Sequence, residues 1–160
     1  TVNVGDLFAQ STAQIAKLCM DTSAYLSEYK MHIICSSQNI YLELNKYEHG
    51  ENVILHNGIL DMRQCYSKAG LVITRSGRNT LSELAYLGIP ALSFLSGCQY
   101  RQAEQRQNLE ALGAPNVKPV DISIQPQKFA DQIKDMIAKP YQRKRFTPGN
   151  EQAIQEILKL

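Results

Sequence analysis

The sequence predicts a doubly wound α/β fold, with a Rossmann-like parallel sheet covered by helices on both faces. Short apolar runs alternate with longer amphipathic stretches in units of about 25–30 residues, as expected for crossovers between parallel strands. The runs are apolar throughout, as strands buried on both faces require. Such sheets bind ligands beyond the carboxyl ends of their strands. We therefore expect function in the loops after Leu55, Thr74 and Leu95.

The expected elements follow one another along the 160 residues, a length that suits one domain with its own core. The strands are expected at residues 1–5, 31–35, 52–55, 71–74, 91–95 and, more weakly, 117–120. The helices are expected at residues 7–29, 38–47, 61–68, from the turn after Thr74 to 87, 103–112, 126–138, and in a last stretch ending at 158. Gly88 and Gly113 end two of these helices, and Pro126 begins another, which matches the positions that glycine and proline favour.

Composition excludes several classes of protein. The 17 Lys and Arg against 15 Asp and Glu give a net charge of +2, too near neutral for a strongly basic nucleic-acid binder, so no nucleic-acid partner is expected. No apolar run approaches the ~20 residues of a membrane-spanning helix, and no signal peptide is evident. The four cysteines form no CxxC pair, which favours reduced thiols and a cytoplasmic location. The three histidines show no metal-ligand spacing, so no metal and no cofactor are expected.

The most informative segment runs from Leu71 to Leu84, where a strand leads through a small polar turn into a helix. Free backbone N–H groups at a helix start, next to the positive end of its dipole, favour a phosphate or diphosphate. The candidate residues for this anion site are Arg75, Ser76, Gly77, Arg78, Asn79 and Thr80. Thr80 and Glu83 also match a capping box, in which side chains satisfy those same amides. The spacing leaves both interpretations open, whereas the absence of GxGxxG and of a Walker lysine excludes the common dinucleotide and P-loop motifs.

Two further segments follow strands on the same side of the sheet. Glu104 and Gln105 are expected in the first turn of the 103–112 helix, where a carboxylate beside a carboxamide suits sugar hydroxyls, and Asn108 lies one turn later. The alternative is a solvated polar face. In the loop at 58–62, Asp61 suits a helix N-cap and Ile59 offers its backbone and an apolar surface to a flat base. His32 lies within an apolar strand and is expected to be a core residue.

Taken in order, these segments resemble the C-terminal domain of the MurG-like glycosyltransferases, glycosyltransferase family 28. The likeness is carried by Ile59-Leu-Asp-Met62, Leu71-Val-Ile-Thr-Arg-Ser-Gly77, Thr80-Leu-Ser-Glu-Leu-Ala85, Gly88-Ile-Pro-Ala-Leu92, Glu104-Gln-Arg-Gln-Asn108 and Leu112-Gly-Ala114. It covers about residues 58–114, and the flanks agree in the order of their elements. Arg78 stands where the family often has a small residue, and the family's glycine-rich loop after the first strand is not evident.

The resemblance implies half of a GT-B enzyme, in which residues 1–160 form a single nucleotide-sugar donor-binding domain. On that basis the Ile59 backbone would contact uracil, residues 76–80 would hold the diphosphate, and Glu83 would bind the ribose. Glu104 and Gln105 would hold the sugar, UDP-N-acetylglucosamine or a similar donor. The transfer would invert the anomeric centre without a metal ion, and the catalytic base and the acceptor would lie in another domain or partner subunit.

Alternatives remain open at this level. The chain, which lacks an initiator Met and opens within an expected strand, is an excised domain or a natural one-domain subunit, and the isolated domain is expected to be inactive. A sugar-nucleotide hydrolase or epimerase would share the architecture. A non-catalytic subunit docking on a membrane-bound glycosyltransferase is motivated by Arg143-Lys-Arg145 and the last helix. Peripheral association of the full enzyme with the inner face of the membrane is a further expectation.

Overall fold

The computed structural model describes residues 2–4, 9–35, 37–58, 60–95, 99–139 and 154–159. Within them lies a parallel sheet of six strands in the order β3-β2-β1-β4-β5-β6. The strands are β1 (Val2–Val4), β2 (Met31–Cys35), β3 (Val53–Asn57), β4 (Val72–Arg75), β5 (Ala91–Phe94) and β6 (Val117–Val120). This order confirms the predicted doubly wound sheet.

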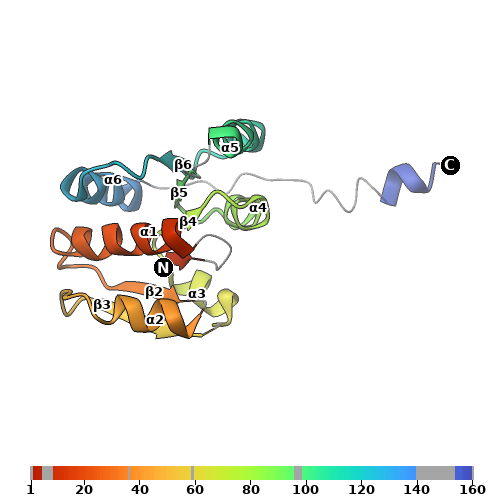
Figure 1. Ribbon diagram of the computed structural model, residues 1–160. Coiled ribbons are helices and arrows are strands. Elements are labelled where there is room, and N and C mark those ends of the chain that lie inside the picture. Colours follow the sequence, from red (N-terminus) through yellow and green to blue (C-terminus); the bar gives the residue numbers. More distant parts are fainter. Residues whose placement is uncertain are drawn as a thin grey trace.

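Helices cover both faces of the sheet (Figure 1). They are α1 (Ala9–Ser23), α2 (Gln38–Leu44), α3 (Met62–Lys68), α4 (Arg78–Leu87), α5 (Gln99–Leu112) and α6 (Pro126–Ala138), and residues 154–157 form a further helical turn. Figure 1 shows α1, α2 and α6 on one face and α3, α4 and α5 on the other. The helices that connect β1 to β3 therefore lie on one face, and those that connect β3 to β6 lie on the other.

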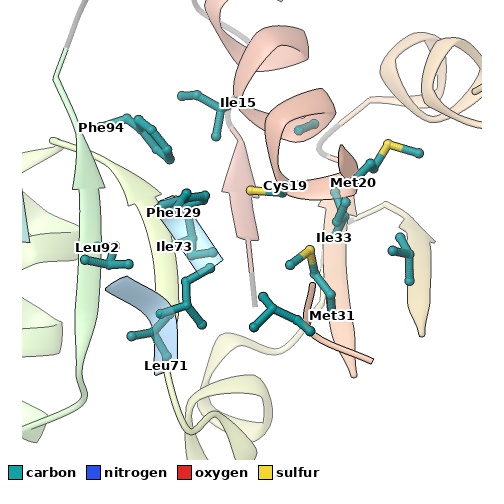
Figure 2. Close-up of a cluster of buried hydrophobic side chains, with 14 of the residues drawn as sticks. Ile15, Cys19, Met20, Met31, Ile33, Leu71, Ile73, Leu92, Phe94 and Phe129 are labelled. Carbon is teal, nitrogen blue, oxygen red and sulfur yellow. The ribbon is translucent and has the colours of Figure 1, made fainter. Parts of the chain in front are cut away.

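The larger core lies under α1, α2 and α6. Alternate strand residues, among them Ile33, Ile73 and Phe94, face Ile15 on α1 and Phe129 on α6 (Figure 2). Phe94 and Phe129 meet edge to face, with ring centroids 5.3 Å apart. Because Val72 of β4 and Ala91 of β5 enter the core under α4, these two central strands are buried on both faces, as the sequence predicted.

The smaller core holds α4 in place on the other face. Leu81, Leu84 and Ala85 of α4 are buried against β4, β5 and β6. Asn116 is 2% exposed, and its Nδ2 donates hydrogen bonds to the carbonyls of Leu84 (3.1 Å) and Ile89 (2.7 Å) at the end of α4. The helix is therefore fixed at its carboxyl end by a buried side chain.

Several element boundaries differ from the sequence predictions. α1 ends at Ser23 rather than near residue 29, because the hydroxyls of Thr22 and Ser23 donate to the carbonyls of Leu18 and Met20. These bonds compete with continued helix. α5 begins at Gln99 rather than at Ala103.

Candidate functional site

The strand order places the topological switch point of the sheet between β1 and β4. The chain runs outward from β1 in one direction through β2 and β3, and in the other through β4, β5 and β6. Ligands of open α/β sheets bind at such a switch point, beyond the carboxyl ends of the strands. The segment Ser76–Gly77 follows β4 directly at this edge, so the sequence placed its main candidate at the position that the topology favours.

The first turn of α4 has no side-chain cap. Its N-cap residue is Gly77, and the Leu81 amide donates the first helical bond, to the Gly77 carbonyl at 3.0 Å. Thr80 is thus the third residue of the helix and Glu83 the sixth, so the capping-box interpretation is wrong. No side chain among the described residues caps this helix start. Backbone N–H groups therefore remain available at the positive end of the helix dipole.

The turn at Gly77 is open. Its backbone (φ −85°, ψ 128°) is one that any residue adopts, and a Cβ placed on it would meet no atom of the described residues within 4 Å, its chain neighbours apart. Neither local strain nor packing within the described residues therefore requires glycine here. A glycine that the chain does not need for its own packing leaves room for a group in front of the amides of α4.

Ser76 holds the turn through buried hydrogen bonds to β5. Ser76 is 7% exposed, and its Oγ donates to the Phe94 carbonyl (3.1 Å) and lies 2.7 Å from Ser93 Oγ. The Ser76 amide also donates to the Phe94 carbonyl, at 3.0 Å. Arg75 is half-buried, and burial lowers the pKa of its guanidinium, which remains charged at neutral pH. These bonds tie the turn to β5 and fix the direction in which the amides of α4 point.

Arg78 and Glu104 bring the start of α4 together with α5. Arg78 Nη2 lies 3.7 Å from Glu104 Oε1, and the two side chains are 72% and 57% exposed. Because α5 begins at Gln99, Glu104 lies in its second turn, not in its first as predicted. Gln105 and Asn108 are half-buried further along this helix. The predicted anion-binding and sugar-binding segments are thus neighbours.

The other predicted residues lie around this pair. Asn79 and Gly77 are exposed and Thr80 is half-buried in the first turn of α4. Glu83 is exposed, and its charge, after burial, contributes to raising the pKa of Tyr66 on α3. Its carboxylate is therefore on the α3 side of α4. Asp61 is the N-cap of α3, accepting a bond from the Arg63 amide at 3.0 Å, as predicted. Ile59, the predicted uracil contact, lies outside the described residues, as does Arg143-Lys-Arg145.

A histidine pair that the sequence did not predict lies beside α3. His32 Nδ1 is 2.9 Å from His56 Nε2, with the rings stacked at 5.1 Å. Both line a cavity of about 320 Å³ with Asp61, Cys65 and Lys68. His32 is half-buried rather than a core residue, and burial, followed by the charge of His56, lowers its pKa. The register of β2 and β3, which sequence does not reveal, creates this pair.

The described residues show neither a metal-binding cluster nor a membrane-spanning helix. Among the residues that the structure describes, no group of three or more His, Cys, Asp or Glu side chains is arranged to hold a metal ion. Nor does this part contain a helix of the length and apolarity that crossing a membrane takes. Cys19 is fully buried, which raises the pKa of its thiol to about 12, and Cys35 is also buried. These two thiols are packing residues.

The fold and the site define a Rossmann-like α/β domain with an uncapped helix start at its topological switch point. The sequence pattern of the glycosyltransferase family 28 C-terminal domain matches residues 6–160. The chain therefore belongs to this family and represents its C-terminal domain. The family resemblance drawn from the motifs is confirmed.

Known relatives agree. The chain is 33% identical over 91 residues to the UDP-N-acetylglucosamine--N-acetylmuramyl-(pentapeptide) pyrophosphoryl-undecaprenol N-acetylglucosamine transferase of Haemophilus ducreyi, covering 57% of this chain and 24% of the relative. It is 29% identical over 120 residues to the transferase of the same name from Desulforamulus reducens, covering 70% and 32%. The aligned regions thus span about a quarter to a third of these relatives.

Solved structures confirm the fold. The glycotransferase of kitacinnamycin superimposes with a TM-score of 0.68 at 16% identity, over 87% of this chain and 34% of that one. MurG of Acinetobacter baumannii superimposes with a TM-score of 0.61 at 21% identity, over 85% and 40%. At these identities the likeness establishes a GT-B-type Rossmann-like half and no more.

Proposed function

We propose that this chain is the donor-binding domain of a glycosyltransferase, and that it binds a UDP-sugar of the UDP-N-acetylglucosamine type. The observation that carries the proposal is the uncapped start of α4 behind the open turn at Gly77, at the switch point of the sheet. Backbone amides and a helix dipole suit a diphosphate. The relatives, whose names specify UDP-N-acetylglucosamine, support the nucleotide and the sugar.

In this proposal each segment of the crevice has one part of the donor to recognise. The amides at the start of α4 and the Arg78 guanidinium hold the diphosphate. Glu83, on the side of α4 nearer α3, accepts hydrogen bonds from the ribose hydroxyls, and the loop before Asp61 receives the base. Glu104, Gln105 and Asn108 on α5 hold the sugar.

The chemistry then follows from charge. Transfer of the sugar breaks the bond between its anomeric carbon and the diphosphate oxygen, and negative charge develops on the departing UDP. A helix N-terminus and a guanidinium stabilise such charge where it forms. We propose that α4 supplies this stabilisation in place of a metal ion, and that the acceptor attacks from the opposite face with inversion. The base and the acceptor site belong to a second domain or a partner subunit, which together with this chain would work at the inner face of the membrane.

Titration of the 160-residue chain with UDP and UDP-N-acetylglucosamine, by calorimetry or by NMR shift perturbation, tests the proposal. We expect weak but saturable binding of both, because half of the cleft is contributed elsewhere. Uridine, which lacks phosphate, is the matched control and should bind more weakly than UDP. A folded chain that binds neither nucleotide at millimolar concentration would refute the proposal.

A further inference from the structure

The Arg78–Glu104 pair spans the two parts of the proposed donor site. Arg78 is the first residue of α4, the helix whose first turn has no side-chain cap. Glu104 lies on α5, among the residues proposed to hold the sugar. Their charged atoms are 3.7 Å apart. The same guanidinium that would hold a diphosphate is therefore held by the carboxylate that would hold the sugar.

This ion pair is weak enough to be exchanged. The separation of 3.7 Å is longer than a hydrogen bond, and both side chains are more than half exposed. Exposed pairs of this kind contribute little to stability, since solvent screens them. A diphosphate offers the guanidinium charge-assisted and bidentate hydrogen bonds, which are much stronger. A ligand at the start of α4 would therefore displace Glu104 from Arg78.

We propose that Arg78 exchanges partners when the donor binds. Its guanidinium moves from the Glu104 carboxylate to the diphosphate, which frees that carboxylate to bind the sugar. This inference rests on the donor-binding function proposed above. It makes Glu104 a specificity-determining residue that competes with free nucleoside diphosphate for Arg78. A sugar with free hydroxyls compensates the released carboxylate, because a carboxylate only accepts hydrogen bonds and hydroxyls donate them.

The exchange distinguishes the sugar-nucleotide donor from the product UDP. With a sugar nucleotide bound, both Arg78 and Glu104 have partners. With UDP alone bound, the Glu104 carboxylate has lost its ion pair with Arg78 and gains no hydrogen bond from the ligand. Its return to Arg78 therefore favours UDP release. The pair therefore weakens retention of the product UDP relative to the sugar nucleotide.

A double-mutant cycle tests this exchange. The wild-type chain, Arg78→Gln, Glu104→Gln and the double variant are titrated calorimetrically with UDP and with UDP-N-acetylglucosamine at one fixed salt concentration. Glu110→Gln is the matched control, because Glu110 is an exposed glutamate on the same helix, six residues or about 9 Å further along. Thermal melts confirm that each variant is folded.

We expect Glu104→Gln to bind UDP about two- to fivefold more tightly than wild type, the effect of releasing one exposed ion pair. Its preference for the sugar nucleotide over UDP should fall. In the Arg78→Gln background the same change should give no gain, and Glu110→Gln should give none. Equal gains with and without Arg78, or unchanged UDP binding in Glu104→Gln, would overturn the exchange while leaving the donor site standing. A wild-type chain that binds neither ligand would overturn both.

Discussion

The substitution Gly77→Ala tests whether Gly77 is needed for ligand binding or for the fold. The added methyl meets no atom of the described residues within 4 Å, its chain neighbours apart, and the backbone there (φ −85°, ψ 128°) suits alanine. Removing a glycine lowers the entropy of the unfolded chain, a gain of about 0.4–1 kcal/mol. Alanine is a poorer N-cap than glycine, which costs about as much. The two effects offset, so we expect the free energy of unfolding to change by less than about 0.5 kcal/mol and Tm by about 1–2 °C.

The effect on binding should be much larger. The methyl would occupy the space in front of the α4 amides, where a phosphate must approach to accept their hydrogen bonds. Each hydrogen bond to a charged group is worth about 1.5–3 kcal/mol. Loss of one therefore predicts UDP affinity lower by about tenfold to a hundredfold.

Calorimetric titration with UDP, paired with thermal melts, measures both quantities. Gly70→Ala is the matched control: a Cβ there also meets nothing within 4 Å, but Gly70 precedes β4 at the opposite edge of the sheet. Because no N-cap is lost at Gly70, this variant should leave UDP affinity nearly unchanged and raise Tm by about 1–4 °C. Gly77→Ala should leave uridine binding unchanged. A folded Gly77→Ala variant with wild-type UDP affinity would refute a diphosphate at this turn. A large fall in Tm would show that the fold itself needs this glycine.

Substitutions at three other positions test separate parts of the structure. Glu83→Ala should weaken UDP binding more than Glu83→Gln and leave Tm unchanged, because Glu83 does not cap α4; equal losses of Tm without a change in affinity would contradict this. Asn116→Ala removes two buried hydrogen bonds and should cost about 1–3 kcal/mol, lowering Tm by roughly 3–10 °C; an unchanged melt would show that these bonds do not hold α4. NMR titration should find the pKa of His32 below its usual value. The unfolded chain then binds a proton more readily than the folded chain, so the free energy of unfolding should fall as pH falls through about 6.5. His56→Phe keeps the stacked ring but removes the charge, so it should raise the pKa of His32 part of the way, and an unchanged value would exclude coupling between the rings.

Local signals in the sequence predicted those boundaries that depend on one or two residues. Gly88 ends α4 in the left-handed conformation (φ 70°), and Pro126 is at the start of α6, as expected. The predicted start of α5 was wrong. The pattern of apolar residues placed it at Ala103, whereas residues 99–102 contain no helix breaker and the helix extends back to Gln99.

Contacts between elements were beyond the reach of sequence. The chain order put Arg78 and Glu104 after neighbouring strands, which was enough to predict one crevice. Their separation of 3.7 Å depends on how α4 and α5 pack. The capping-box interpretation failed for a related reason: Thr80 and Glu83 have the right spacing, but Gly77 begins the helix three residues earlier. Spacing fixes which side chains share a face, whereas the first residue of a helix is set by the turn that precedes it.

The helical period of α4 assigns its support and its binding to different residues. Leu81, Leu84 and Ala85 face the core, whereas Arg78 and Asn79 are exposed at its first turn. Apart from the Arg78 guanidinium, the proposed diphosphate contacts are main-chain amides, whose direction is set by these buried side chains and by the bonds behind the turn. The exposed positions are therefore free to vary in charge without loss of the fold. A change of charge at these positions would alter which nucleotide is retained, and the Arg78–Glu104 pair is one such combination of charges.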